Sequence, residues 1–113
     1  MVNNTAVKRI ISFYFIDKEF SYALYAPNKD KRWELKEYGP TEEDVAFAKR
    51  FIDWSNLDWG IQRVDACRSE QGRLLLVELE DLNPYLSLLE LTEETRENFI
   101  EAMKISLQKA LQI

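Results

Sequence analysis

Alternating apolar and polar positions, together with β-branched and aromatic runs, mark four strands along the chain. Residues 8–16 and 20–26 are rich in Ile, Phe and Tyr and are separated by only three residues. They are therefore predicted to form a hairpin. Residues 61–68 and 73–80 predict a second hairpin with a short polar turn. The short charged stretch 32–38 is ambiguous and is expected as an edge strand at most.

Apolar residues at helical spacing predict two helices. The first runs from Thr41 to about Trp54 and begins with a capping pattern formed by Thr41 and Asp44. The second runs from Thr92 to about Leu111. The face of this second helix that we expect to be buried consists of Phe99, Ile100, Met103, Leu107 and Leu111.

The resulting order of elements is ββαββα. Hairpins separated by helices predict an α+β fold, in which helices pack on one face of an antiparallel sheet. The length of 113 residues is that of a single domain, so residues 1–113 are interpreted as one unit.

Charged residues alternate with apolar residues in the second hairpin. Around a turn of two or four residues, opposed residue numbers sum to about 141, so Arg63 faces Glu78. Alternation then places Asp65 and Glu80 on the same face as this pair. The opposite face is expected to join the core and carries Val64, Ala66, Leu75, Val77 and Leu79. A loop of odd length or a bulge would break this parity.

Three carboxylates on one face repel one another. Two unit charges about 4 Å apart cost roughly 4 kcal/mol at an effective dielectric constant near 20. Either Arg63 or a hard cation such as Mg²⁺, which takes oxygen ligands, would offset this repulsion. The same alternation also describes an ordinary solvated face of a half-buried sheet, and both interpretations stay open at this level.

Composition narrows the classes of function. The net charge of −5 argues against nucleic acid or an anionic membrane as a general partner. Long apolar runs are absent and the single cysteine, Cys67, has no partner for a disulfide, so a soluble protein in the reducing cytoplasm is expected. The absence of histidine excludes Ser-His and Cys-His nucleophile systems, which favours Cys67 as a small apolar filler.

The segment RVDACRSEQGRLLLVELEDLNPYLSL resembles the C-terminal part of ATP-grasp domains, in particular a prokaryotic subgroup related to glutathione synthetases. Members of that subgroup carry an RVD strand, an ELE strand and then a short proline-containing segment. Upstream, FIDKEFSYALY, DKRWEL and TEEDVAFAKRFID resemble the preceding hairpin, arginine segment and helix. The resemblance covers about residues 10–88.

The resemblance implies an ATP-dependent ligase that joins a carboxylate to an amine through an acyl phosphate. Asp65, Glu78 and Glu80 match residues that bind Mg²⁺, or Mn²⁺ in its place. Arg63 matches an arginine that faces phosphate or acyl phosphate and is the candidate catalytic residue. Further candidates for phosphate or substrate binding are Arg32 and Asn83.

The chain also departs from the family pattern. Tyr22 replaces a histidine of the first hairpin, and Lys18 replaces a turn glycine, which matters if that position needs a positive φ. The sequence lacks a glycine-rich phosphate loop and the nucleotide-binding first half of an ATP-grasp enzyme. ATP is therefore expected to bind only with a partner half, and the chain alone is expected to be inactive.

Three interpretations follow. The chain is a fragment or split half of a ligase, a stand-alone relic that acts as a homodimeric binding module, or a complete small enzyme of another sort. Four aromatic residues are relevant to the interpretation as a homodimeric module. They either form an exposed patch that drives association or belong to the core. They are Trp33, Trp54, Trp59 and Tyr85.

Overall fold

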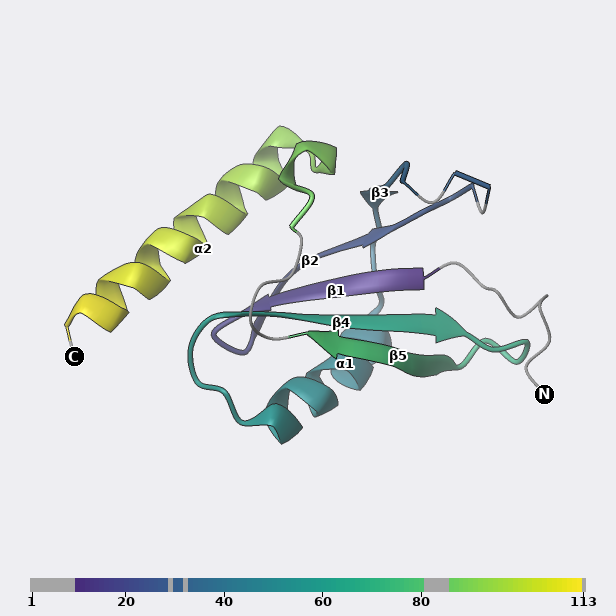
Figure 1. The fold of residues 1–113 in the computed structure, drawn as a ribbon, viewed down its shortest axis with the longest axis horizontal. Coiled ribbons are helices and arrows are strands. Elements are labelled where there is room, and N and C mark those ends of the chain that lie inside the picture. Colours follow the sequence, from purple (N-terminus) through teal and green to yellow (C-terminus); the bar gives the residue numbers. More distant parts are fainter. Residues whose placement is uncertain (1–9, 29, 32, 81–85, 113) are drawn as a thin grey trace.

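The fold is an α+β arrangement of one antiparallel five-stranded sheet and two long helices (Figure 1). The computed structural model describes residues 10–28, 30–31, 33–80 and 86–112. The strand order is β3-β2-β1-β4-β5. The elements are β1 (Ile10–Ile16), β2 (Glu19–Tyr25), β3 (Lys36–Glu37), α1 (Glu42–Ser55), β4 (Ile61–Arg68), β5 (Leu74–Glu80), the short 3₁₀ helix η2 (Leu88–Glu90) and α2 (Glu93–Leu111).

The class, the antiparallel sheet and the order of the elements are as predicted from the sequence. Both hairpins form, and the ambiguous charged stretch supplies a two-residue edge strand, β3, which pairs with β2. The first helix begins with the expected capping box: the Asp44 N–H donates to Thr41 Oγ1 (3.1 Å), and the Thr41 N–H donates to Asp44 Oδ2 (3.2 Å).

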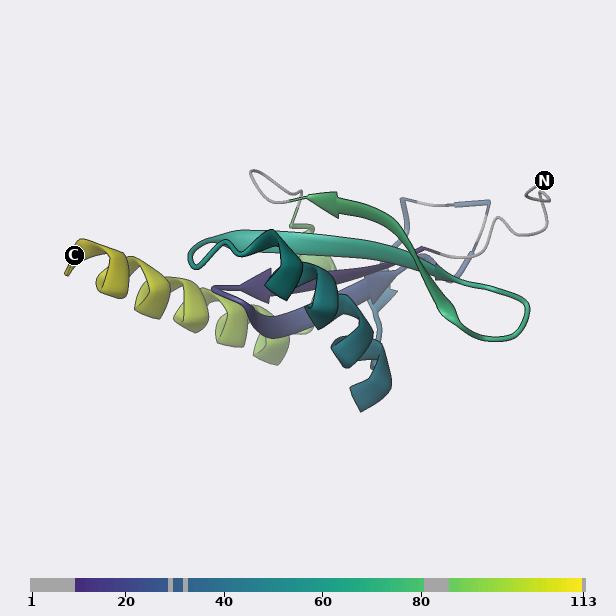
Figure 2. The same ribbon diagram turned by 90° about the horizontal axis from the view of Figure 1, so that it is seen from below.

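The two helices pack on opposite faces of the sheet, whereas the sequence led us to expect them on one face. Phe13 and Phe15 of β1 belong to one buried cluster together with Ile52 of α1. Tyr14, which alternates with them along the strand, belongs to a second cluster with Phe99 of α2. Because successive strand residues point to opposite faces, the core has two layers, one under each helix. Figure 2 shows α1 lying along the sheet, while the end of α2 extends past it.

Helix α2 packs through its N-terminal half. Phe99 is buried and Met103 packs against the same cluster, as predicted. Ile100 and Leu107, by contrast, are exposed, and Leu111 is 85% exposed. The predicted buried face is therefore wrong over these three positions. For Leu107 and Leu111 the reason is that the C-terminal turns of the helix extend beyond the ends of the strands (Figure 1).

The turn between β1 and β2 has two residues with positive φ, Asp17 (49°) and Lys18 (74°). Two such residues give a hairpin turn whose twist matches that of the strands. The turn is also tied to the loop before β4. The Asp17 N–H donates to the Gly60 carbonyl (2.9 Å), the Gly60 N–H donates to Asp17 Oδ1 (2.7 Å), and Lys18 forms an ion pair with Asp58 (3.2 Å).

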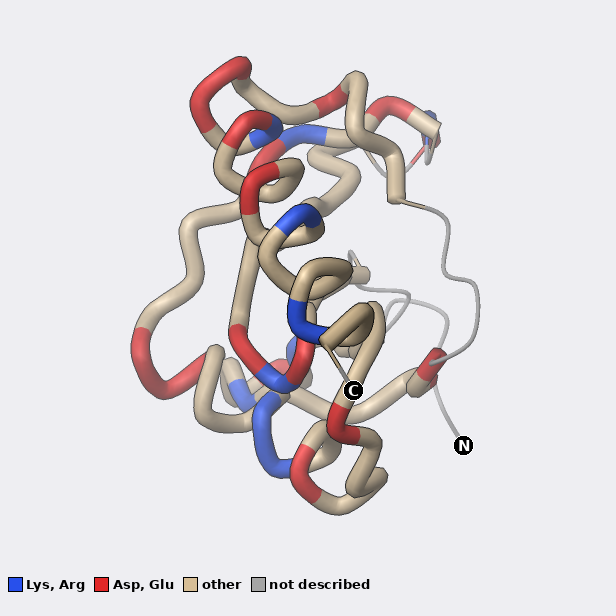
Figure 3. Tube along the Cα trace, turned by 90° about the vertical axis from the view of Figure 1, so that its left-hand side faces the viewer, with Lys and Arg blue, Asp and Glu red and all other residues tan. Residues whose placement is uncertain are grey.

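Several large aromatic side chains are on the surface. Trp33, Trp54 and Trp59 are 72%, 79% and 49% exposed, so the expectation that they belong to the core is wrong for these three. Tyr85 lies outside the described residues. Figure 3 shows acidic and basic positions at both ends of the molecule in that view. Within the described ranges, no helix combines the length and apolarity needed to cross a membrane.

Candidate functional site

The register of the β4–β5 hairpin decides which charged residues meet. Arg63 lies opposite Glu80, and Asp65 lies opposite Glu78. The sequence-based pairing of Arg63 with Glu78 is therefore wrong by two residues. Near the turn, Ala66 lies opposite Leu76, and the register shifts between these two parts of the hairpin.

Two local features cause this difference. The Ser69 N–H donates to the Arg73 carbonyl (2.7 Å), which leaves three residues in the loop rather than two or four. Gly72 in this loop has a φ of 85°, as a three-residue hairpin loop requires. Val77 is the extra residue of a β-bulge on β5. The three-residue loop and the bulge each reverse which residues of β5 share a face with a given residue of β4. Beyond the bulge the two reversals cancel, so the predicted faces are restored at the far end of the hairpin.

As a result, Arg63, Asp65, Glu78 and Glu80 share one face of the sheet, as predicted, although with different partners. The first half of β5 follows the shifted register instead. The expectation that Leu75 and Val77 belong to the core is wrong, because both are about half exposed. The hairpin residues that pack into or against the core under α1 are Val64, Ala66, Leu74 and Leu79.

Arg63 lies at the centre of the charged face. Its Nε and Nη2 donate to the two carboxylate oxygens of Asp65, each at 2.9 Å, and Nη2 also lies 3.1 Å from Glu80 Oε2. The side chains of Arg63 and Asp65 are only 15% and 10% exposed. Burial opposes the guanidinium charge, but Asp65, with Tyr14 and Glu80, outweighs it and raises the pKa of Arg63.

Two tyrosines connect this cluster to the layer under α2. Tyr14 lies opposite Arg63 in the sheet and stacks on Tyr22, with ring centroids 4.3 Å apart. Burial raises the pKa of both hydroxyls, and Arg63 offsets this only partly for Tyr14. The Tyr22 hydroxyl donates to the Leu86 carbonyl (2.7 Å). Tyr22 thus holds the segment that leads into α2.

The carboxylate oxygens of Asp65, Glu78 and Glu80 are suitable ligands for a hard cation, but the three side chains do not converge on one point in this structure. Asp65 and Glu78 are cross-strand neighbours, and such pairs are close enough to share an ion. Glu80 instead forms an ion pair with Arg63. The same guanidinium also pairs with Asp65, so it already supplies positive charge to the carboxylates of Asp65 and Glu80. Among the residues that the structure describes, no group of three or more acidic or cysteine side chains is disposed to hold a metal ion. Magnesium therefore stays a prediction.

Two other candidates from the sequence, Arg32 and Asn83, lie outside the described residues. The sequence reasoning also missed a second charged cluster on the opposite face. Arg68 Nη2 donates to Asp44 Oδ2 (2.8 Å) and to the Tyr38 hydroxyl (2.9 Å). Asp44 had been identified only as a helix cap, and nothing in the pattern along the chain connects it with an arginine 24 positions away.

Comparison with known proteins finds similarity among solved structures. No protein-family model and no curated protein sequence match this chain. Its fold is similar to the crystal structure of D-cycloserine synthetase DcsG, an ATP-grasp enzyme, with a TM-score of 0.60 and 21% sequence identity. The similarity covers 83% of this chain but only 36% of that protein. The chain therefore has an ATP-grasp-like α+β fold, compatible with the C-terminal subdomain of such an enzyme.

Proposed function

We propose that this chain is the C-terminal, metal- and phosphate-binding half of an ATP-grasp carboxylate–amine ligase-like protein. In this proposal it is a fragment or split half, inactive alone, with a glutathione synthetase-like relationship inside that family. The observation that carries the proposal is the position of Arg63 beside Asp65, on the same sheet face as Glu78 and Glu80. The ATP-grasp-like fold supports it.

The residues of this face have distinct proposed roles. Asp65, Glu78 and Glu80 hold Mg²⁺ or Mn²⁺, which neutralises charge on the phosphates of ATP. Arg63 binds the phosphate or acyl phosphate through its planar fork of donors. Because Arg63 now bonds Asp65 and Glu80, it must give up carboxylate contacts before it can serve a phosphate. Arg32 and Asn83 are proposed to assist in phosphate or substrate binding.

The proposed partner is the missing nucleotide-binding half, without which ATP does not bind tightly. Nucleic acid and membranes are not proposed as partners, and the proposed location is the cytoplasm. The size relationship supports a missing half, since the similarity covers 36% of the solved ligase. The C-terminal subdomain supplies metal ligands, while adenine recognition belongs to the other half of the clamp in this family.

An alternative proposal is a stand-alone ATP-grasp relic that acts as a homodimeric binding module. It is supported by the exposed apolar surface of β5 and α1, where Leu75, Leu76 and Val77 lie on an edge strand and Trp54 lies on the helix. An edge strand with exposed apolar side chains favours association with another chain.

Calorimetric titration with Mn²⁺ tests the proposed metal site. We expect weak binding by the natural chain and none by the variant Asp65→Asn/Glu78→Gln/Glu80→Gln. The control, Glu70→Gln/Glu97→Gln/Glu101→Gln, removes three exposed carboxylates elsewhere and so changes the net charge equally. Its binding should resemble that of the natural chain. Equal heats for both triple variants would contradict the metal assignment.

A further inference from the structure

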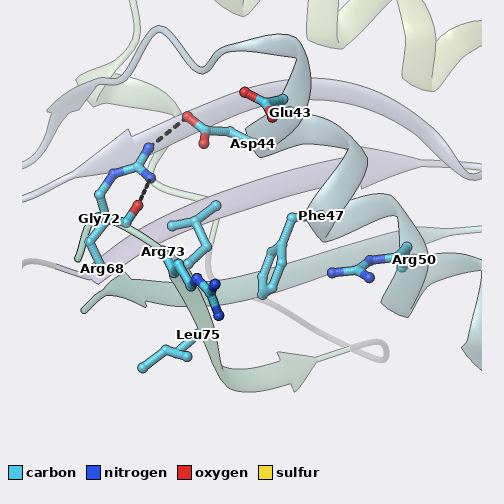
Figure 4. A pocket seen from close by; sticks show the side chains of 9 residues that line it. Glu43, Asp44, Phe47, Arg50, Arg68, Gly72, Arg73 and Leu75 are labelled. Atoms are coloured by element: carbon cyan, nitrogen blue, oxygen red, sulfur yellow. Dashed lines mark hydrogen bonds and ion pairs between the residues drawn. The ribbon is translucent and has the colours of Figure 1, made fainter. Parts of the chain in front are cut away.

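A pocket of about 480 Å³ lies on the sheet face opposite the acidic cluster, between α1 and the turn of the β4–β5 hairpin (Figure 4). It is lined by three arginines, one each from α1, β4 and the β4–β5 loop, and its apolar lining comes from one phenylalanine and two leucines. These residues are Arg50, Arg68, Arg73, Phe47, Leu74 and Leu75. The volume is in the range of small-molecule sites.

Arg68 is held in place by the protein. Its Nη1 donates to the Gly72 carbonyl (2.9 Å), and its Nη2 donates to the Tyr38 hydroxyl and to Asp44. These bonds use three of the five N–H donors of a guanidinium, so two remain for a ligand. Asp44 is itself buried and paired, which means that its charge is already matched by Arg68.

The other two arginines are not matched in this way. Arg50 lies over the Phe47 ring, 5.4 Å from its centroid. In Figure 4, Arg73 lies on the other side of Phe47 from Arg50. Within the described part of the chain, neither guanidinium forms an ion pair. The lining includes one further acidic residue, Glu43.

We infer that this pocket binds a small organic phosphate. The phosphate group meets the guanidinium groups of Arg68 and Arg73, Arg50 adds positive charge from the other side of Phe47, and an apolar or aromatic body contacts Phe47 and Leu75. The three arginines outnumber the two acidic residues of the lining, Glu43 and Asp44, so the pocket has a net positive charge, from which a phosphate dianion gains more than a singly charged carboxylate does. Planar guanidinium forks also match phosphate oxygens in geometry. The site is independent of the proposed metal face, because it lies on the other side of the sheet.

Calorimetry with phenyl phosphate tests this inference. We expect saturable binding by the natural chain that weakens at least about tenfold in Arg50→Gln/Arg73→Gln, because this variant loses the charge-assisted hydrogen bonds of Arg73 and the positive charge of Arg50. The control Lys36→Gln/Lys104→Gln also removes two positive charges, from exposed sites that do not line the pocket. Its affinity should stay within about twofold of the natural value.

Further measurements make the test decisive. Inorganic phosphate should bind more weakly than phenyl phosphate, and benzoate more weakly still. The variant Glu78→Gln should bind phenyl phosphate normally, which separates this site from the proposed metal site. If circular dichroism shows that the double variant is unfolded, Arg73→Gln alone replaces it. No saturable binding, equal affinity in the arginine variants, or benzoate binding as tightly as phenyl phosphate would overturn the inference.

Discussion

Arg63 and Asp65, two positions apart on the same face of β4, are joined by two parallel hydrogen bonds of 2.9 Å each. The same guanidinium reaches Glu80 at 3.1 Å. An arginine therefore provides positive charge to two of the three neighbouring carboxylates, in the place where a divalent cation was predicted. Experiments can therefore ask whether the guanidinium of Arg63 competes with a divalent metal ion for these carboxylates.

The variant Arg63→Met should bind Mn²⁺ about tenfold more tightly than the natural chain, because the competing cation is gone and Glu80 is released. Without metal, the same variant should lose about 1–3 kcal/mol of unfolding free energy, since Asp65 stays largely buried without its partner. Calorimetry and thermal melts with and without Mn²⁺ measure both effects. Arg73→Met, on the opposite face, is the control. An unchanged Mn²⁺ affinity in Arg63→Met would show that Arg63 does not compete with metal.

Asp44 should make the fold sensitive to acid. Burial opposes its charge, but bonds from Arg68 and Thr41 outweigh this and lower the pKa of the Asp44 carboxyl. A lowered folded-state pKa stabilises the protein above the unfolded-state value near 4, and this stability is lost as the pH falls toward the folded-state value. The difference in unfolding free energy between the natural chain and Asp44→Asn should thus be about 1–3 kcal/mol at pH 7 and shrink below about pH 4. Urea unfolding at several pH values measures it, and a constant difference down to pH 2.5 would contradict this account.

The first hairpin turn offers a test of backbone strain at Lys18. A residue other than glycine in the left-handed region costs about 1 kcal/mol, and Lys18 has a φ of 74°. The variants Lys18→Gly and Lys18→Ala both lose the ion pair with Asp58, so the difference between their stabilities isolates the strain. Lys18→Gly should be more stable than Lys18→Ala by about 1 kcal/mol in chemical denaturation. Equal stability would mean that the turn relaxes without cost.

Association and nucleotide binding distinguish the two proposed functions. A split half should sediment as a 13.4 kDa monomer and bind Mg-ATP weakly, because half of the clamp is missing. A homodimeric module should show a larger, concentration-dependent mass. In that case Leu76→Ser and Val77→Ser should weaken the dimer, because they remove apolar area from the exposed edge strand. Micromolar affinity for Mg-ATP in the isolated chain would contradict the half-protein proposal.

Local patterns in the sequence determined the element order, both hairpins and the capping box at Thr41. These features depend on neighbours a few residues apart, so the chain alone specifies them. The shared face of Arg63, Asp65 and Glu80 was also predicted correctly, but partly because two unpredicted irregularities of the hairpin cancel each other. The odd loop before Arg73 and the bulge at Val77 each invert the alternation, and neither has a clear sequence signal.

Tertiary structure alone decided the rest. The two helices lie on opposite faces because α1 meets the layer of Phe13 and α2 meets the layer of Tyr14, a choice that the pattern along each helix does not contain. The sheet ends before α2 does, so Leu107 is exposed although its spacing is that of a core residue. The pairing of Asp44 with Arg68 likewise depends on how a helix packs against a strand. Periodicity gives the face that a residue shares with its neighbours, whereas packing decides whether anything covers that face.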